Sequence, residues 1–188
     1  MSRRAILKQQ LCEAWTAAIQ RDYHRQRINS ERSLQASLWS QLNSILSPKS
    51  RRMFIEPTLT ATSPNIENQL TRESRIPDLV ICNTKEVIGV VEIKYIPRVR
   101  PNWRKDLDTF SWINKHRDQF AIRNKRHRGV ANDDRKYRLS KDVLFVWAGV
   151  HSEEDVDLSQ HIDHELAKHF LEMHAVTRAG KDPVLKCQ

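Results

Sequence analysis

Residues 76–96 read IPDLVICNTKEVIGVVEIKYI, two short segments rich in Val and Ile on either side of a polar turn. β-Branched residues favour strands, whereas polar residues such as Asn83 are typical of turns. We therefore predict a β-hairpin with strands at 76–82 and 87–96 and a turn at 83–86. Both strands are apolar enough to lie inside a sheet, so the charged residues within them need an explanation.

Three charged residues stand inside this hairpin: Asp78 at the start of the first strand, and Glu92 and Lys94 late in the second. Alternate side chains of a strand share a face, so Glu92 and Lys94 project together. If the loop consists of residues 84–86, the numbers of paired residues sum to 170 and Asp78 lies opposite Glu92. A two-residue loop would instead place Asp78 opposite Val91 and separate the carboxylates.

Two neighbouring carboxylates repel each other, and burying them is costly unless a cation holds them. Magnesium prefers oxygen ligands and is commonly bound by one or two carboxylates together with substrate phosphates. Such a metal polarises a phosphate and lowers the pKa of a bound water, while Lys94 can orient that water or offset charge at phosphorus. A structural interpretation, in which Glu92 only pairs with Lys94, must explain three charges on one face of two apolar strands.

The pattern Pro77-Asp78, then 13 residues, then Glu92-Ile93-Lys94 resembles the PD-(D/E)xK nucleases. The resemblance implies a restriction-endonuclease-like core over about 31–150, a Mg²⁺ cofactor for which Mn²⁺ substitutes, and hydrolysis of DNA phosphodiester bonds. It implies that Asp78, Glu92 and Lys94 are catalytic and that the two acids are metal ligands. Some members add an acid from the preceding helix, a place that Glu31 occupies here, although a carboxylate in a first helical turn is also favoured by the helix dipole.

The basic residues are concentrated in one segment. The chain has a formal charge of +9, and residues 94–138 hold 14 Lys and Arg against five Asp, which accounts for the whole excess. A basic block attracts polyanions and favours phosphate contacts, although a solvated loop can have the same composition. Beside a nuclease motif we predict DNA contacts, from Arg104, Lys105, Arg123, Lys125, Arg126, Arg128, Arg135, Lys136 and Arg138.

The remaining segments predict one α/β domain over residues 1–188. Apolar stripes indicate helices at 3–21, from Asn29 or Ser30 to Pro48, and at 102–117. Residues 52–60 and 143–150 are expected strands, 61–75 a polar connection, and 153–176 a last helix. This order predicts a mixed central sheet flanked by helices, with the helices at 3–21 and 153–176 as additions to the core.

Other features narrow the class of protein. Three widely spaced cysteines predict reduced thiols rather than a disulfide framework or a zinc knuckle. The chain lacks an apolar secretion signal and any apolar run of about 18 residues, so we expect a cytoplasmic protein without a membrane partner. His164 and His169 are five residues apart and cannot share a helix face, which argues against a zinc-protease motif.

Three functions stay open at this point. The first is a Mg²⁺-dependent deoxyribonuclease, expected to be an endonuclease. The second is a catalytically inactive nucleic-acid-binding module of the same fold, and the third is a nuclease subunit of a transposition or defence assembly. The isolated chain could act as a homodimer or within a larger nucleoprotein assembly.

Overall fold

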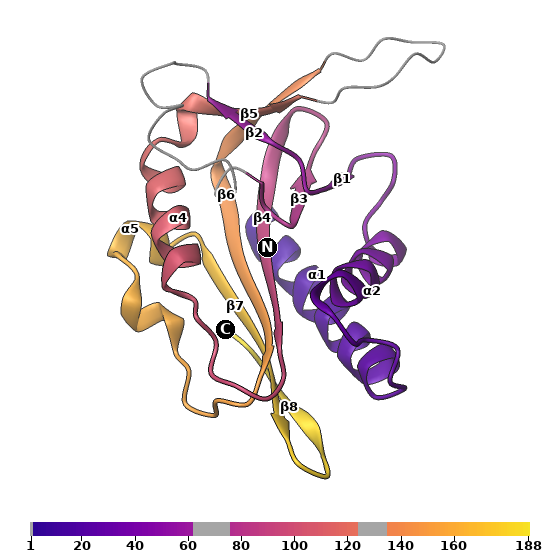
Figure 1. Ribbon diagram of the computed structural model, residues 1–188. Helices are drawn as coiled ribbons and strands as arrows, with labels where there is room; N and C mark the ends of the chain where they lie inside the picture. The colour runs from indigo at the N-terminus through magenta and orange to yellow at the C-terminus, as the bar shows by residue number, and fades with distance from the viewer. Residues whose placement is uncertain (1, 62–75, 124–134) are drawn as a thin grey trace.

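A mixed β-sheet lies between two layers of helices in the computed structural model, which describes residues 2–61, 76–123 and 135–188 (Figure 1). Helices α1 (Arg3–Ala17) and α2 (Glu31–Ile45) cover one face of the sheet. Helix α4 (Arg104–Lys115) and the short α5 (His164–Ala167) lie over the other. The predicted α/β class with a mixed central sheet is confirmed. Among the described helices, none has the length and apolar character needed to cross a bilayer.

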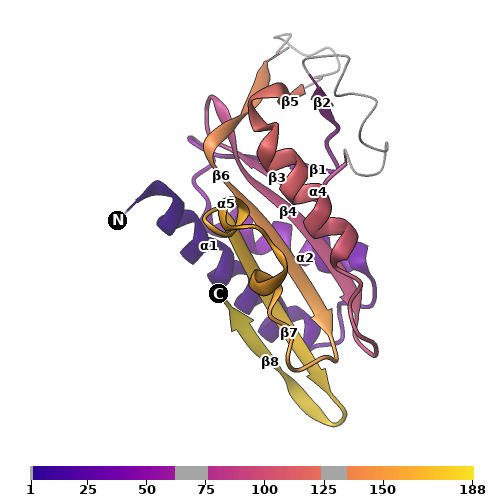
Figure 2. The same ribbon diagram turned by 90° about the vertical axis from the view of Figure 1, so that its left-hand side faces the viewer.

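The longest strand, β6, organises the sheet because it borders three others. The strand order is β1-β3-β4-β6-β5-β2, and β7 lies beside the second half of β6 with β8 beyond it (Figure 2). The β4–β6 and β6–β7 pairs are parallel and the rest are antiparallel. The strands are β1 (Arg52–Ile55), β2 (Leu59–Ala61), β3 (Leu79–Cys82), β4 (Glu86–Ile96), β5 (Phe120–Arg123), β6 (Lys136–His151), β7 (Phe170–Arg178) and β8 (Lys181–Cys187).

Side-chain alternation in the central strands divides the interior into two apolar cores. In β4, Val91 and Ile93 belong to the core beneath α1 and α2, whereas Val90 belongs to the core beneath α4. Because alternate residues share a face, Glu92 and Lys94 lie on the α4 side with Val90. The predicted catalytic residues therefore point toward α4.

The N-terminal predictions are confirmed with local differences. Helix α1 continues through a π-helical turn (Ala18–Tyr23), and α2 begins after Ser30, whose side chain accepts a hydrogen bond from the Ser33 N–H. The predicted strand at 52–60 is two strands, because the chain turns at Glu56 (φ 47°) and Pro57 cannot donate a ladder hydrogen bond. The predicted connection at 61–75 lies outside the described residues from position 62 onward.

The predicted last helix at 153–176 is wrong. This segment forms a 3₁₀ turn (Leu158–His161), the four-residue α5, and most of β7, and β8 follows as the last strand. Residues 170–176 of β7 are all buried and pair in parallel with β6. Phe170 and Met173 fit the helical stripe begun by Leu166, whereas the alternation of apolar and polar residues over 171–175, which is typical of a strand, is short. The C-terminal segment therefore extends the central sheet.

The prediction of reduced thiols is wrong for two of the three cysteines. Cys12 in α1 and Cys187 in β8 form a disulfide, with Cα atoms 6.1 Å apart, whereas Cys82 is free and buried. The two cysteines are 175 residues apart in sequence, so only the fold brings them together. The bond ties the first helix to the last strand.

A buried carboxylate joins the segments of the C-terminal part. Glu172 in β7, which is 1% exposed, accepts hydrogen bonds from the Leu158 N–H (2.8 Å), the His174 imidazole (2.8 Å) and the Gln188 amide (3.3 Å). Main-chain hydrogen bonds also link Glu172 and Gln188 in both directions. This residue therefore holds the turn before α5, the strand β7 and the C-terminus together.

Replacing this carboxylate should destabilise the protein strongly. In Glu172→Ala, two buried donors, the Leu158 N–H and the His174 imidazole, lose their acceptor, and we expect a loss of about 3 kcal/mol in the free energy of unfolding. For a chain of this size that corresponds to a melting temperature roughly 6–12 °C lower. Thermal unfolding followed by circular dichroism measures it, with Glu165→Ala at an exposed position as the control; equal melting temperatures for the two variants would contradict the role of Glu172.

Candidate active site

Three separate elements fix the position of Asp78. Its main-chain carbonyl accepts hydrogen bonds from the Gln35 side chain in α2 (2.7 Å) and from the Glu56 N–H after β1 (3.1 Å). Its carboxylate oxygen Oδ2 accepts a hydrogen bond of 2.6 Å from the Ile93 N–H in β4. The carboxylate is therefore held at the main chain between Glu92 and Lys94.

The register of the hairpin is the one that brings the two carboxylates together. Leu79 pairs with Val91 and Ile81 with Gly89, so paired residue numbers sum to 170 as expected. The turn differs from the expected one, because Cys82 pairs with Val87 and the register shifts by one residue before Gly89. A β-bulge, rather than a three-residue loop at 84–86, thus sets the alignment at the site.

Lys94 lies between two acids. Its Nζ atom is 2.8 Å from Oε1 of Glu92 and 3.5 Å from Oδ1 of Asp106, a residue of α4. The Trp147 indole N–H donates to the other oxygen of Asp106 at 3.2 Å. The Lys94 and Glu92 side chains are only 23% and 22% exposed, so the ion pair is largely shielded from solvent.

Asp106 is a site residue that the sequence analysis missed. It lies four residues before Phe110 and seven before Ile113, both of which are in the core beneath α4. That spacing puts Asp106 on the buried stripe of the helix, and it is 9% exposed. A charged residue on an apolar stripe is the helical counterpart of Glu92 in an apolar strand and could have been recognised in the same way.

Burial makes the acids of this site hard to ionise. It is the main cause that raises the pKa of Asp78 to about 6 and the pKa of Glu92 to about 7, and the negative charge of Asp78 contributes to the value for Glu92. The pKa of Asp106 is also raised by burial. For Lys94, burial lowers the pKa, but the charges of Glu92 and Asp106 outweigh burial and hold its pKa above the ordinary value.

Glu31 lies at the same site, in the first turn of α2. It precedes Gln35, which contacts Asp78, by one helical turn. Its negative charge contributes to the raised pKa values of both Asp78 and Lys94. The structure thus brings the predicted Glu31 within electrostatic reach of Asp78 and Lys94.

The site opens into a cavity of about 250 Å³ between β4 and α4. Glu92, Lys94 and Asp106 line it together with Lys105 and Thr109. Pro77, which precedes Asp78, and apolar side chains such as Phe110 complete the lining. The cavity has room for a phosphate group beside the carboxylates.

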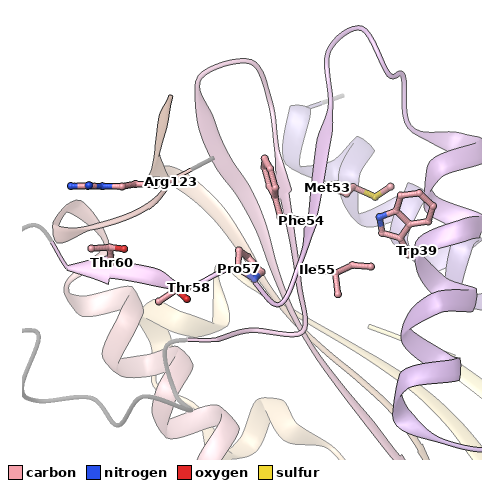
Figure 3. Close-up of a pocket in the computed structure, with 8 residues that line it drawn as sticks. All are labelled: Trp39, Met53, Phe54, Ile55, Pro57, Thr58, Thr60 and Arg123. Carbon is pink, nitrogen blue, oxygen red and sulfur yellow. The ribbon is translucent and has the colours of Figure 1, made fainter. Parts of the chain in front are cut away.

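A second cavity, of about 770 Å³, lies at the edge strand β1 (Figure 3). Arg123 and Thr60 lie toward one end of it and Trp39 and Ile55 toward the other. None of its described lining residues is acidic, so it offers no carboxylate ligands. The chemistry is therefore assigned to the smaller cavity.

The predicted basic residues fall into separate groups. Arg104 and Lys105 begin α4, and Lys105 lines the smaller cavity, the one that Glu92 and Lys94 also line. Lys136 and Arg138 are exposed and alternate with buried side chains of the α4-side core, so they point away from that core. Arg138 pairs with Glu86, which precedes Glu92 by six residues, or about 20 Å along β4.

The other predicted basic residues are also distant or outside the described part of the chain. Arg123 ends β5 beside Lys136, and the Arg135 side chain donates to the main-chain carbonyl of Thr84 at the hairpin turn. The structure does not describe Lys125, Arg126 and Arg128. Of the described residues predicted to contact DNA, Lys105 at the start of α4 lines the cavity of Glu92 and Lys94.

The donor set suits a divalent cation by its chemistry. Within the described ranges, no three His, Cys, Asp or Glu side chains form a preassembled metal cluster. Asp78 and Glu92 nevertheless supply the oxygen ligands that Mg²⁺ prefers, and a cation would offset the cost of burying them and the effect of the Asp78 charge on Glu92. When ionised, the three acids Asp78, Glu92 and Asp106 outnumber the two ammonium groups that act on them, those of Lys94 and Lys105.

Comparisons with known proteins assign no family. No protein-family model matches the chain, and no curated protein matches it either. The assignment of a function therefore depends on the geometry and charge of the site.

The buried acids should make the metal-free protein less stable as the pH rises. Because the folded state holds a proton on Glu92 up to about pH 7, against an ordinary pKa of 4.5, stability is greatest below about pH 4.5 for this group and falls until about pH 7. Glu92→Gln removes this loss. At pH 8 in chelator we expect the variant to be more stable by on the order of 1–2 kcal/mol, or a few degrees in melting temperature.

Differential scanning fluorimetry across pH 4 to 8 measures the effect, with the exposed Glu165→Gln as the matched control. The gap between Glu92→Gln and wild type should widen with pH. A variant that melts at or below the wild-type temperature at pH 8 would show that the carboxylate is not destabilised by burial.

Proposed function

We propose that this chain is a metal-dependent nuclease that hydrolyses DNA phosphodiester bonds, as an endonuclease with a restriction-endonuclease-like core of the PD-(D/E)xK kind. The observation that carries the proposal is that the hairpin holds the Asp78 carboxylate at the Ile93 N–H, between Glu92 and Lys94, which both line a cavity. A pair of acids beside an amine, next to room for a phosphate, is suited to phosphodiester hydrolysis.

Asp78 and Glu92 would hold Mg²⁺, or Mn²⁺ in its place, with Glu31 as a further acid nearby. When bound, the metal polarises the scissile phosphate and makes a bound water more acidic. Hard oxygen ligands and two carboxylates are the usual protein contribution to such a site.

Lys94 acts as a cation and hydrogen-bond donor rather than as a base. Its contacts with Glu92 and Asp106 favour the protonated amine. A protonated amine can orient the attacking water or stabilise charge that develops on the phosphate oxygens. Arg104 and Lys105, at the start of α4, are placed to contact neighbouring phosphates of the substrate.

A purely structural ion-pair network explains the site less well. Such a network gains stability when buried charges balance, whereas here Glu92 and Asp106 both contact Lys94, and Asp78 adds a third carboxylate whose pKa is raised by burial. The inactive DNA-binding module remains the contrasting function, since Lys136 and Arg138 form a basic edge away from the cavity. It would bind DNA in a salt-dependent way without metal and without cutting it.

Cleavage assays on purified protein test the reaction. With Mg²⁺ the wild type should nick or linearise supercoiled plasmid, and chelator should abolish the activity. We expect Asp78→Asn and Lys94→Ala to lower the cleavage rate by roughly 100- to 1000-fold, because each removes a charge needed in the transition state. The exposed Lys141→Ala should cleave like the wild type, and full activity in both site variants would reject the catalytic assignment.

Metal binding can be measured without any substrate. At pH 8, Mg²⁺ at about ten times its dissociation constant should stabilise the wild type by roughly 1.4 kcal/mol, seen as a melting temperature a few degrees higher. Asp78→Asn and Glu92→Gln should lose this increase, while Glu165→Gln retains it. An equal increase in all four proteins would place the bound ion elsewhere and favour the inactive module.

A further inference from the structure

Asp106 contacts two residues that come from different strands. One oxygen is 3.5 Å from the Lys94 Nζ atom in β4, and the other accepts the Trp147 indole N–H in β6 at 3.2 Å. Each carboxylate oxygen therefore has its own partner, Lys94 for one and Trp147 for the other. Lys94, Asp106 and Trp147 form one continuous chain of polar contacts beneath α4.

The indole of Trp147 has little freedom to move. Its side chain is fully buried, and a Cβ atom at position 149 would overlap its six-membered ring, so Gly149 leaves the space that the ring occupies. Gly149 lies opposite Lys94 on one side and opposite His174 on the other. The His174 and His151 rings lie 5.4 and 5.9 Å from the indole, so aromatic contacts support the ring on the side away from Lys94.

Asp106 is not required to neutralise Lys94. Glu92 already pairs with the same amine at 2.8 Å, whereas Asp106 lies 3.5 Å from it and is closer to the Trp147 indole N–H, at 3.2 Å. Asp106 instead restricts the position of the Lys94 amine, because the amine contacts one acid from β4 and another from α4. The Trp147 indole N–H in turn restricts the Asp106 carboxylate by binding its second oxygen.

We propose that Asp106 and Trp147 are positioning residues for the catalytic amine: Asp106 orients Lys94, and the Trp147 indole N–H orients Asp106. This inference rests on the proposed nuclease function. It assigns a part in catalysis to α4 and β6, which lie outside the hairpin that carries the motif.

Two variants separate the contacts of Asp106. Asp106→Asn keeps an amide oxygen that can accept the Trp147 N–H but removes the charge that holds Lys94. Trp147→Phe keeps an aromatic ring and the charge of Asp106 but removes the indole donor. The matched control is Trp15→Phe, since Trp15 is also fully buried and donates to the His174 carbonyl at 3.3 Å, on the opposite face of the sheet.

Steady-state cleavage kinetics with Mg²⁺ should show a loss in kcat rather than in KM. We expect kcat to fall about 10- to 100-fold in Asp106→Asn and about tenfold in Trp147→Phe, with KM changed by less than about threefold, because in this proposal both residues act through Lys94. Trp15→Phe should stay within about twofold of the wild type in both constants. A loss in Trp15→Phe equal to that in Trp147→Phe would mean a structural effect and would overturn the proposal.

An NMR measurement tests the contacts without activity. The chain has five tryptophans, so a ¹⁵N spectrum should contain five indole N–H signals, and Trp147→Phe and Trp15→Phe identify two of them. Asp106→Ala and Lys94→Ala should both shift the Trp147 signal and leave the Trp15 signal in place. An unmoved Trp147 signal in Asp106→Ala would overturn the positioning chain.

The two levels of the proposal fail in different ways. If the wild type cleaves DNA and Asp106→Asn has the same kcat, the positioning role is rejected and the nuclease stands. If the wild type cleaves none of the plasmid, linear, single-stranded or branched substrates with Mg²⁺ or Mn²⁺, the nuclease and the positioning role fall together.

Discussion

The hydrogen bond from the Ile93 N–H to the Asp78 carboxylate joins the two strands of the hairpin at the point where the charges gather. A slip of one residue in β4 would turn Glu92 and Lys94 into the core beneath α1 and α2, where unpaired charges cost several kcal/mol. Val91 and Ile93 fill that core in the observed register. The same alternation that builds the core thus also assembles the site.

Local patterns in the sequence predicted the hairpin and the capped second helix, because each depends on residues close together in the chain. They left two hairpin registers open, and the structure has the one that sums to 170, reached through a bulge between Val87 and Gly89 rather than through the expected loop. Long-range features could not be predicted in this way. The strand β7 resembles a helix in its spacing until β6 and β8 cover it, and the Cys12–Cys187 disulfide depends on strand order alone.

Ionising the acids of the candidate site lowers the stability of the folded protein. Raised pKa values at Asp78, Glu92 and Asp106 mean that the folded protein resists ionising them. Natural sequences often keep such groups where function needs them and compensate elsewhere. Here the compensation is visible in the contacts that hold Asp78 from α2, β1 and β4.

The C-terminal strands bear on this site although they lie outside the region that carries the motif. Trp103, at the start of α4, stacks on His161 with ring centroids 4.3 Å apart, and the segment containing His161 is tied to β7 through Glu172. Glu172 in turn binds the C-terminal Gln188, next to the disulfide at Cys187. Because α4 carries Asp106, a displacement of β7 or β8 would shift α4 through these contacts and change the distance between Asp106 and Lys94. The segment predicted as an added helix is therefore better understood as part of the support that sets the distance between α4 and β4.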